Sequence, residues 1–232
     1  MRSRGAPARP FVTANFAITA DGRISTRNFT PSDFSSPRDK RRLLEIRAAC
    51  DAVLVGARTL AADSMTLGIP ADDLREARRR KERPELPLRV IVSNSGRIDP
   101  ALRIFREPAA PILIFSTTRM PPRTRIALAS KAHLHLHASP AVDLALALAM
   151  LRREHGVRRL VCEGGGELFR SLLHEELVDE LHLTLCPRLF GGAGAPTLTG
   201  VASRFLPRST RVRLQEMLVS EGECFTRWKV LR

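Results

Sequence analysis

The sequence contains no tyrosine, one tryptophan and only four lysines, although lysine and arginine together number 38. The positive charge therefore comes mainly from arginine, and with 24 Asp and Glu residues the net formal charge is +14. Proteins that bind single-stranded nucleic acid usually interleave basic residues with aromatic stacking platforms. Because aromatic residues are scarce, we interpret the charge first as a general arginine-rich composition, and second as an attraction for phosphorylated ligands.

Long apolar runs are also absent, since none approaches the roughly 18–20 residues that a bilayer-spanning helix needs. The first ten residues, MRSRGAPARP, have no apolar segment after their positive charges, so we expect no secretory signal. The four cysteines are far apart, so no CxxC pattern for a metal or a redox site occurs. We therefore expect a cytoplasmic protein without a membrane partner.

One segment invites interpretation as a metal site, because three histidines alternate with two leucines from His133 to His137. In a strand, the three imidazoles would share one face. No carboxylate or cysteine lies nearby to complete a ligand set, so we predict a strand with leucines inward and histidines outward, and no metal. Neither the GxSxG nucleophile elbow nor a phosphate-binding P-loop occurs in the sequence.

Short apolar segments alternate with helical patterns along the chain. Strands are predicted over residues 10–19, 51–56, 89–92, 112–115, 157–162 and 181–186, and a hairpin over 210–231. Helices are predicted over 37–49, over 139–156 and after the glycines at 164–166, while 70–88 is predicted to be a solvated helix or a linker. In the first helix, Ser36 is the expected N-cap, Pro37 the first residue, and Asp39 faces the free amides.

This alternation predicts an α/β fold with a mostly parallel central sheet flanked by helices and a C-terminal antiparallel hairpin. Residues 1–9 are interpreted as a flexible leader. Residues 10–232 are expected to form a single domain, because the sequence contains no internal repeat and no convincing boundary.

The strongest local signal is LVCEGGGEL at residues 160–168, where a buried strand runs into three glycines and then a helix. Glycines allow a ligand to touch the backbone, and the amides at a helix start favour phosphate. Small or hydroxyl residues also follow two other strands, at 56–59 and 93–96. Ligands collect beyond the carboxyl ends of parallel strands, so a dinucleotide is predicted there, with Arg58 and Arg97 near its 2′-phosphate.

The chain resembles the riboflavin-biosynthesis pyrimidine reductases, the reductase half of a bifunctional deaminase–reductase with a dihydrofolate-reductase-like fold. Four segments carry the resemblance, at residues 9–22, 47–63, 89–98 and 163–192, of which EGGGELFRSLLHEELVDELHLTLCPRLFGG is the most specific. The resemblance implies the NADPH-dependent reduction of a phosphoribosylaminopyrimidine to its ribitylamino form. It also implies a homodimer and no nucleic-acid partner.

The resemblance assigns site residues position by position. Matching the family's cofactor contacts are Ile18, Thr59, Asp63, Ser93, Gly164, Gly165, Gly166, Glu167 and Leu168. Matching its substrate contacts are Asn15, Arg47, Leu67 and Glu163, of which Glu163 and Asn15 are the expected catalytic residues.

The sequence departs from the family pattern at three places. In one of them, the residues 64–67 (SMTL) replace a common Asp/Asn-Pro-x-Leu pattern. Asn15 stands where many bifunctional enzymes have lysine, and Pro70 where a basic residue often binds the substrate phosphate. Three arginines of the next helical segment are candidates to compensate, namely Arg75, Arg78 and Arg79. The zinc-binding pattern of the deaminase half is absent.

Three questions stay open at this point. The substrate pyrimidine could be the deaminated or the undeaminated form, and the resemblance names no proton donor. A reductase of another pterin or pyrimidine, such as dihydrofolate, is the first alternative. A basic nucleic-acid-binding module is the second, and steep salt dependence of binding would identify it.

Overall fold

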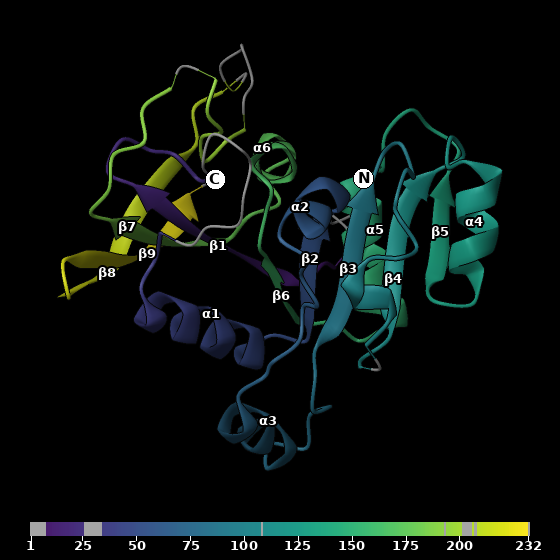
Figure 1. Ribbon diagram of the computed structural model, residues 1–232, viewed down its shortest axis with the longest axis horizontal. Helices are drawn as coiled ribbons and strands as arrows, with labels where there is room; N and C mark the ends of the chain where they lie inside the picture. The colour runs from purple at the N-terminus through teal and green to yellow at the C-terminus, as the bar shows by residue number, and fades with distance from the viewer. Residues whose placement is uncertain are drawn as a thin grey trace, which may run out of the picture.

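The computed structural model describes residues 8–25, 34–107, 109–192, 194–200, 206 and 208–231. Within these residues nine strands form one sheet in the order β5-β4-β3-β2-β6-β1-β7-β9-β8 (Figure 1). The strands are β1 (Phe11–Thr19), β2 (Ala52–Gly56), β3 (Leu88–Ser93), β4 (Ile112–Thr117), β5 (His133–His137), β6 (Arg159–Cys162), β7 (Glu180–Cys186), β8 (Arg211–Ser220) and β9 (Glu223–Leu231). In this order, all neighbouring strands from β5 through β4, β3, β2, β6 and β1 to β7 pair in parallel. Strand β9 runs antiparallel to both β7 and β8, and this arrangement confirms the predicted fold.

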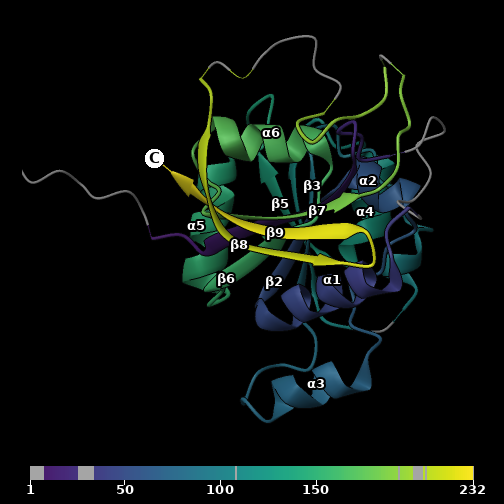
Figure 2. The same cartoon turned by 90° about the vertical axis from the view of Figure 1, so that its left-hand side faces the viewer.

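Helices cover both faces of this sheet. They are α1 (Pro37–Ala49), α2 (Ala57–Ala62), α3 (Asp72–Arg79), α4 (Pro122–Ala129), α5 (Leu144–Glu154) and α6 (Gly166–His174), with a 3-10 turn at Arg103–Phe105. Figure 2 shows α6 and α1 on opposite sides of the sheet. No helix of the described ranges is long and apolar enough to cross a bilayer.

The central strands are buried on both faces, which explains their nearly continuous apolar sequences. Along β2, Val53 and Val55 pack into a core that contains Ile46 of α1. Leu54 faces the other way, into a core shared with Leu148 of α5. The sheet therefore separates two hydrophobic cores, in three layers.

The start of α1 confirms the predicted cap. The Ser36 hydroxyl accepts a hydrogen bond from the Asp39 amide at 3.1 Å, and Pro37 is the first helical residue. The predicted helix over 139–156 is wrong at its start, because α5 begins at Leu144 with the Asp143 carboxylate accepting from the Leu146 amide. Short helices α2 and α4 were not predicted, since six to eight residues carry too little periodicity.

Segment 70–88 contains α3, and its arginines serve local structure. Arg78 is 2% exposed and donates to the carbonyl oxygens of Ala48, Cys50 and Pro84, which caps the end of α1. Arg75 and Arg79 both pair with Glu85. None of the three arginines lines the cleft at the sheet edge, so their compensation for Pro70 at a substrate phosphate stays a prediction. Figures 1 and 2 show α3 away from the sheet.

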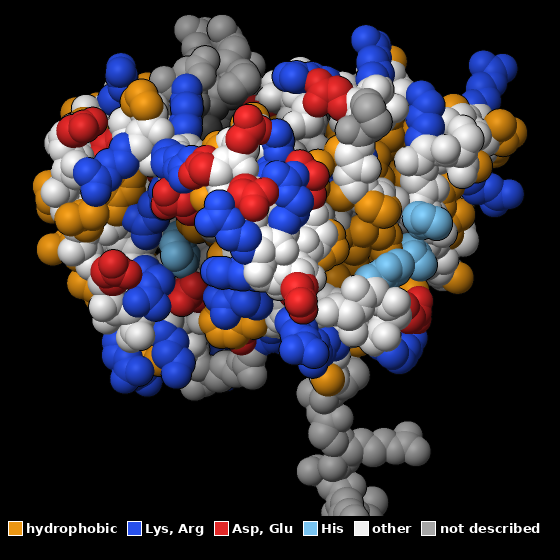
Figure 3. All heavy atoms as spheres, turned by 90° about the horizontal axis from the view of Figure 1, so that it is seen from below, with side chains coloured by type: hydrophobic (Ala, Val, Ile, Leu, Met, Phe, Trp, Pro, Cys, Tyr) orange, Lys and Arg blue, Asp and Glu red, His pale blue; other side chains and the backbone are white. Residues whose placement is uncertain are grey.

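Charges of both signs alternate over the lower face, which Figure 3 shows from below. Arg41, for example, lies between two carboxylates, those of Glu45 and Asp73. The arginine-rich composition is thus partly balanced by local ion pairs on this face.

Strand β5 places its leucines as predicted, since Leu134 and Leu136 pack against the core that contains Ile46 of α1. The expectation of outward histidines is wrong for His135, whose half-buried ring stacks on Phe115 at 4.9 Å between centroids. Among the residues that the structure describes, no group of three His, Cys, Asp or Glu side chains is arranged to hold a metal.

The C-terminal hairpin forms as predicted, around Gly222. Phe225 of β9 is only 3% exposed and Trp228 packs against the core, so neither offers free apolar area. The edge strand β8 instead exposes apolar side chains, those of Val212, Leu214, Met217, Leu218 and Val219.

Candidate active site

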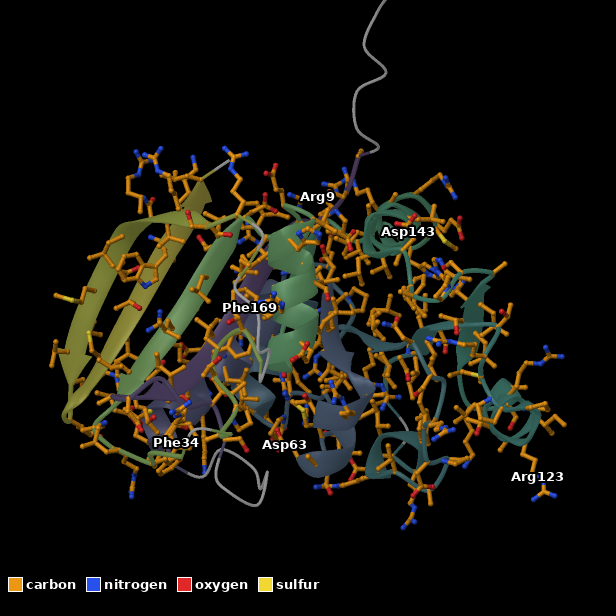
Figure 4. The ribbon with its side chains drawn as sticks, turned by 90° about the horizontal axis from the view of Figure 1, so that it is seen from above. Arg9, Phe34, Asp63, Arg123, Asp143 and Phe169 are labelled. Carbon is orange, nitrogen blue, oxygen red and sulfur yellow. The ribbon has the colours of Figure 1, made fainter. Side chains whose placement is uncertain are left out.

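A cleft of about 970 Å³ lies beyond the carboxyl ends of the central parallel strands. It is lined from β1, α1, the β2–α2 junction, the end of β3 and the β6–α6 loop. Figure 4 shows Asp63 and Phe34 on the edge of the molecule opposite to Arg9, which precedes β1. This is the edge where open α/β sheets bind ligands.

One half of the cleft is built from the three predicted strand ends. Seven of the predicted cofactor contacts line it, namely Thr59, Asp63, Ser93, Gly165, Gly166, Glu167 and Leu168. The junctions also contribute Arg58 after β2 and Asn94 and Ser95 after β3. The structure thus brings together small and hydroxyl residues that are far apart in the sequence.

The glycine loop is fixed between β2 and α6. The Gly56 amide donates to the Gly164 carbonyl at 2.8 Å, and the Glu163 amide donates to the Leu54 carbonyl at 3.0 Å. A Cβ at Gly165 would collide with the Thr59 hydroxyl, and one at Gly166 would lie 2.8 Å from the carbonyl oxygen of Thr197. Side chains are therefore excluded here by close neighbours.

These residues fit a dinucleotide. Helix α6 begins at Gly166 on the cleft lining, and the first amides of a helix favour phosphate oxygens. Arg58 adds a positive charge on the lining. Arg97 is exposed and is not among the lining residues. Of the two arginines predicted to lie near a 2′-phosphate, the structure therefore places Arg58 on the cleft lining and Arg97 outside it.

The other half of the cleft lies between β1, α1 and the end of β6. Its lining includes Asn15, Ala17, Ile24, Ser25, Asp39, Leu43 and Glu163. Strand β6 pairs in parallel with β1, so Glu163, just after β6, extends a register in which Ala14 lies beside Cys162. The two expected catalytic residues therefore lie on neighbouring strands, Asn15 in the middle of β1 and Glu163 just after the end of β6.

Arg47 reaches this half only through Glu163. Its Nε and Nη2 donate to the two carboxylate oxygens of Glu163, each at 2.6 Å, and its Nη1 donates to the Gly68 carbonyl at 2.7 Å. Both side chains are less than a tenth exposed, and Arg47 is not part of the cleft lining. In this structure Arg47 positions Glu163, and its predicted contact with the substrate stays a prediction.

Three further predicted contacts also lie outside the lining, those of Ile18, Leu67 and Gly164. Leu67 is 0% exposed and packs in the core between α1 and the sheet, so its side chain cannot touch a ligand in this structure. Ile18 lies on β1 beside Leu185 of β7. Gly164 contributes backbone geometry, with φ of +105° and a carbonyl bound to Gly56.

The sequence analysis missed Asp39 as a cleft residue. Asp39 is 9% exposed and lines the cleft, and its carboxyl group interacts with the hydroxyl groups of Thr184 and Ser35. Burial raises the pKa of Asp39, and the negative charge of Glu223 raises it further. An acidic residue in a first helical turn is typical of capping, so the local sequence carried no separate signal for this position.

Comparison with known proteins adds to this geometry. A family model described as the RibD C-terminal domain matches residues 10–221. The chain belongs to the RibD C-terminal domain family. Membership confirms the predicted resemblance to riboflavin-biosynthesis pyrimidine reductases and the expected dihydrofolate-reductase-like fold.

The chain is 35% identical to the 2,5-diamino-6-ribosylamino-4(3H)-pyrimidinone 5′-phosphate reductase of Archaeoglobus fulgidus, over 82% of the chain and 86% of the relative. It is also 35% identical to the reductase of the same name from Methanothermobacter thermautotrophicus, over 82% of the chain and 83% of the relative. In structure it resembles a pyrimidine reductase-like protein from Corynebacterium diphtheriae, with a TM-score of 0.84 and 22% identity. The match covers 96% of this chain and 92% of that protein.

Proposed function

We propose that this protein reduces 2,5-diamino-6-ribosylamino-4(3H)-pyrimidinone 5′-phosphate to its ribitylamino form in riboflavin biosynthesis, with NADPH as reductant. Two relatives that are 35% identical over 82% of the chain carry the name of this reductase. The observation that carries the proposal is the continuity of the cleft. Only Gly164 separates Glu163 in one half from Gly165 and Gly166 in the other, so a single loop would hold both ligands in register.

The residues of each half have the chemistry that their ligand requires. When bound, the nicotinamide supplies a hydride. The Glu163 carboxylate, held by Arg47, can accept hydrogen bonds from the amino groups of a diaminopyrimidine. The Asn15 amide can both donate and accept. Holding the sugar carbon at contact distance from the hydride donor is the main service of such a site.

Preference for NADPH over NADH rests on Arg58, the basic residue that the cleft lining includes. A charge-assisted hydrogen bond to a 2′-phosphate contributes about 1.5–3 kcal/mol, or about tenfold or more in affinity. Arg58→Met should therefore weaken NADPH binding and leave NADH binding unchanged. Equal affinities of the wild-type protein for the two cofactors would contradict this assignment.

The decisive experiment is a substrate panel with the purified protein. Oxidation of NADPH is followed with the undeaminated pyrimidine phosphate, its deaminated uracil form and dihydrofolate. We expect the undeaminated compound to give the highest kcat/KM. Turnover of dihydrofolate alone would restore the pterin alternative, which the names of the relatives do not favour.

We also propose that residues 10–232 form one domain, that the protein is a homodimer, and that it works in the cytoplasm. One continuous sheet from β5 to β8 supports the single domain. The exposed apolar side chains of β8, the last strand of the sheet that the described residues form, support pairing with a second copy. Of the predicted leader, residues 1–7 lie outside the described residues.

A further inference from the structure

Helix α1 presents a stripe of three residues, spaced four apart, to the substrate half of the cleft. Asp39 and Leu43 line the cleft directly, and Arg47 holds Glu163. Residues four apart share one helix face, so these side chains follow one another along the groove. Glu163 and Asp39 therefore lie near the two ends of this stripe, with Leu43 between them.

The two carboxyl groups of this half differ in their partners. Both oxygens of Glu163 accept hydrogen bonds from the Arg47 guanidinium, so Glu163 is held as an acceptor. Asp39 has no guanidinium bound to it in the described structure and interacts with the hydroxyl groups of Thr184 and Ser35. Of these two carboxyl groups, Asp39 is therefore the one that no guanidinium of the described residues holds as an acceptor.

The surroundings of Asp39 act in both directions: burial favours its neutral form, and the hydroxyl groups of Thr184 and Ser35 favour its ionised form. Glu223 on β9 is 3% exposed and raises the pKa of Asp39, as does burial. Arg42 on α1 lowers it, but its guanidinium is engaged elsewhere, donating to the Thr226 carbonyl and lying over the Phe225 ring. On β7, the Cys186 thiol is neutral, because burial raises its pKa to about 12.

Resting on the proposed function, we propose that Asp39 is a catalytic residue that gives a proton to the ring oxygen of the substrate's ribosylamine. The C1′–O4′ bond breaks, its electron pair goes to O4′, and O4′ takes the proton from the Asp39 carboxyl group. The exocyclic nitrogen supplies its lone pair to C1′, which gives a protonated imine. The Asp39 carboxylate, now charged, lies where it stabilises that cation.

Hydride transfer to C1′ and reprotonation of Asp39 complete the reaction. C1′ gains a hydride, the protonated imine becomes the ribitylamine, and NADPH is oxidised to NADP⁺. Asp39 recovers its proton from solvent through the open cleft, so the net reaction consumes one proton. Asp39 thus supplies the proton donor that the sequence resemblance leaves unnamed.

The test compares Asp39→Asn with Asp73→Asn in the full-length protein. Both residues lie in the first turn of a helix, but Asp73 is exposed on α3 and away from the cleft lining. General acid catalysis contributes about 10²–10⁴-fold. Asp39→Asn should lower the single-turnover rate by at least about 100-fold, with unchanged NADPH affinity, whereas Asp73→Asn should keep the wild-type rate. The wild-type rate should also fall as pH rises, and Asp39→Asn should lose that dependence.

A second measurement does not depend on turnover. In protein with ¹³C-labelled aspartate carboxyl groups, the signal missing from Asp39→Asn should titrate above the Asp73 signal in NMR. Thr184→Val removes a hydroxyl that stabilises the ionised Asp39 carboxylate, so it should move both this titration and the rate profile to higher pH. If Asp39→Asn fails to fold, Thr184→Val serves as the test.

The outcomes separate the two proposals. A wild-type protein that does not reduce the pyrimidine phosphate contradicts the proposed function, and the role of Asp39 falls with it. An active wild-type protein whose Asp39→Asn variant keeps the same rate and pH profile overturns the role of Asp39 alone. So does an Asp39 carboxyl group that titrates together with Asp73.

Discussion

Arg47 and Glu163 form a two-bond ion pair across 116 residues of sequence, with both nitrogen–oxygen distances at 2.6 Å. The pair joins α1 to the loop after β6, and the third bond of Arg47, to Gly68, joins the segment after α2. The same contact therefore orients a cleft carboxylate and fastens three parts of the chain together. Activity and stability are coupled at this position.

Arg47→Lys should lower both properties, because an ammonium cannot reproduce the planar fork that serves Glu163 and Gly68 together. Removing one partner of a buried pair costs about 3–5 kcal/mol, and the conservative change should cost somewhat less, about 2–3 kcal/mol of unfolding free energy. The matched control is Arg41→Lys, since Arg41 also binds a carboxylate, that of Asp73, through two nitrogens, but on the surface. Urea titration of that control should show a change within about 0.5 kcal/mol. Equal losses in the two variants would contradict the positioning role.

Gly165→Ala should destabilise the protein through Thr59. The backbone of Gly165, with φ of −77°, suits any residue, so the collision of the new Cβ with the Thr59 hydroxyl is the cause. Thr59→Ala should therefore restore most of the lost melting temperature in the double variant. If the double variant melts as low as Gly165→Ala, the strain lies elsewhere. The same substitutions should weaken NADPH binding, since both residues line the cleft.

Arg78→Met should cost about 2–4 kcal/mol of stability without raising the KM for the pyrimidine phosphate. Methionine keeps most of the apolar stem, but it removes the hydrogen bond that Arg78 donates to the buried carbonyl group of Cys50 and the shorter of the two that reach the Ala48 carbonyl. Arg80→Met is the control, because Arg80 is exposed and its loss should stay within about 0.5 kcal/mol. A raised KM in a fully stable Arg78→Met protein would return this arginine to the substrate phosphate.

His135 should make stability depend on pH. Burial lowers the pKa of His135 from 6.5, so the unfolded chain binds a proton that the folded protein resists. The contribution of His135 to the free energy of unfolding is therefore complete above about pH 6.5, and it is lost as the pH falls below that value. His135→Phe should keep the stacking on Phe115 and flatten this part of the curve of unfolding free energy against pH. His133→Phe, at an exposed position of the same strand, should leave the curve unchanged.

The proposed homodimer should be visible in light scattering as a mass of about twice the 25.7 kDa of one chain. Met217→Lys and Val219→Lys place charges on the exposed β8 and should shift the protein to monomers. Ile126→Lys is the control, since Ile126 is equally exposed but lies on α4, beyond the other end of the sheet. A mass near 25.7 kDa for the wild-type protein at micromolar concentration would contradict the dimer.

Much of the fold follows from interactions that are local in sequence. The Ser36–Pro37 start of α1, the glycines after β6 and the turn at Gly222 act within a few residues of themselves. The period of the apolar residues likewise predicts which segments are strands. Short or weakly periodic elements escape such reasoning, which is why α2 and α4 were not predicted and the start of α5 was misplaced.

The candidate site divides in the same way. Thr59, Ser93 and Gly165 stand at strand ends that the sequence marks by composition, and the sequence by itself placed them at a common sheet edge. The tertiary structure decided which of these side chains line the cleft. The strand order places β6 between β1 and β2, and Glu163, just after β6, is thereby within hydrogen-bond distance of Arg47 on α1. In that pairing, the Arg47 guanidinium holds the Glu163 carboxylate in place. The same packing buries Asp39 against the β7–β9 side of the sheet, an environment made by residues more than a hundred positions away, which no local pattern encodes.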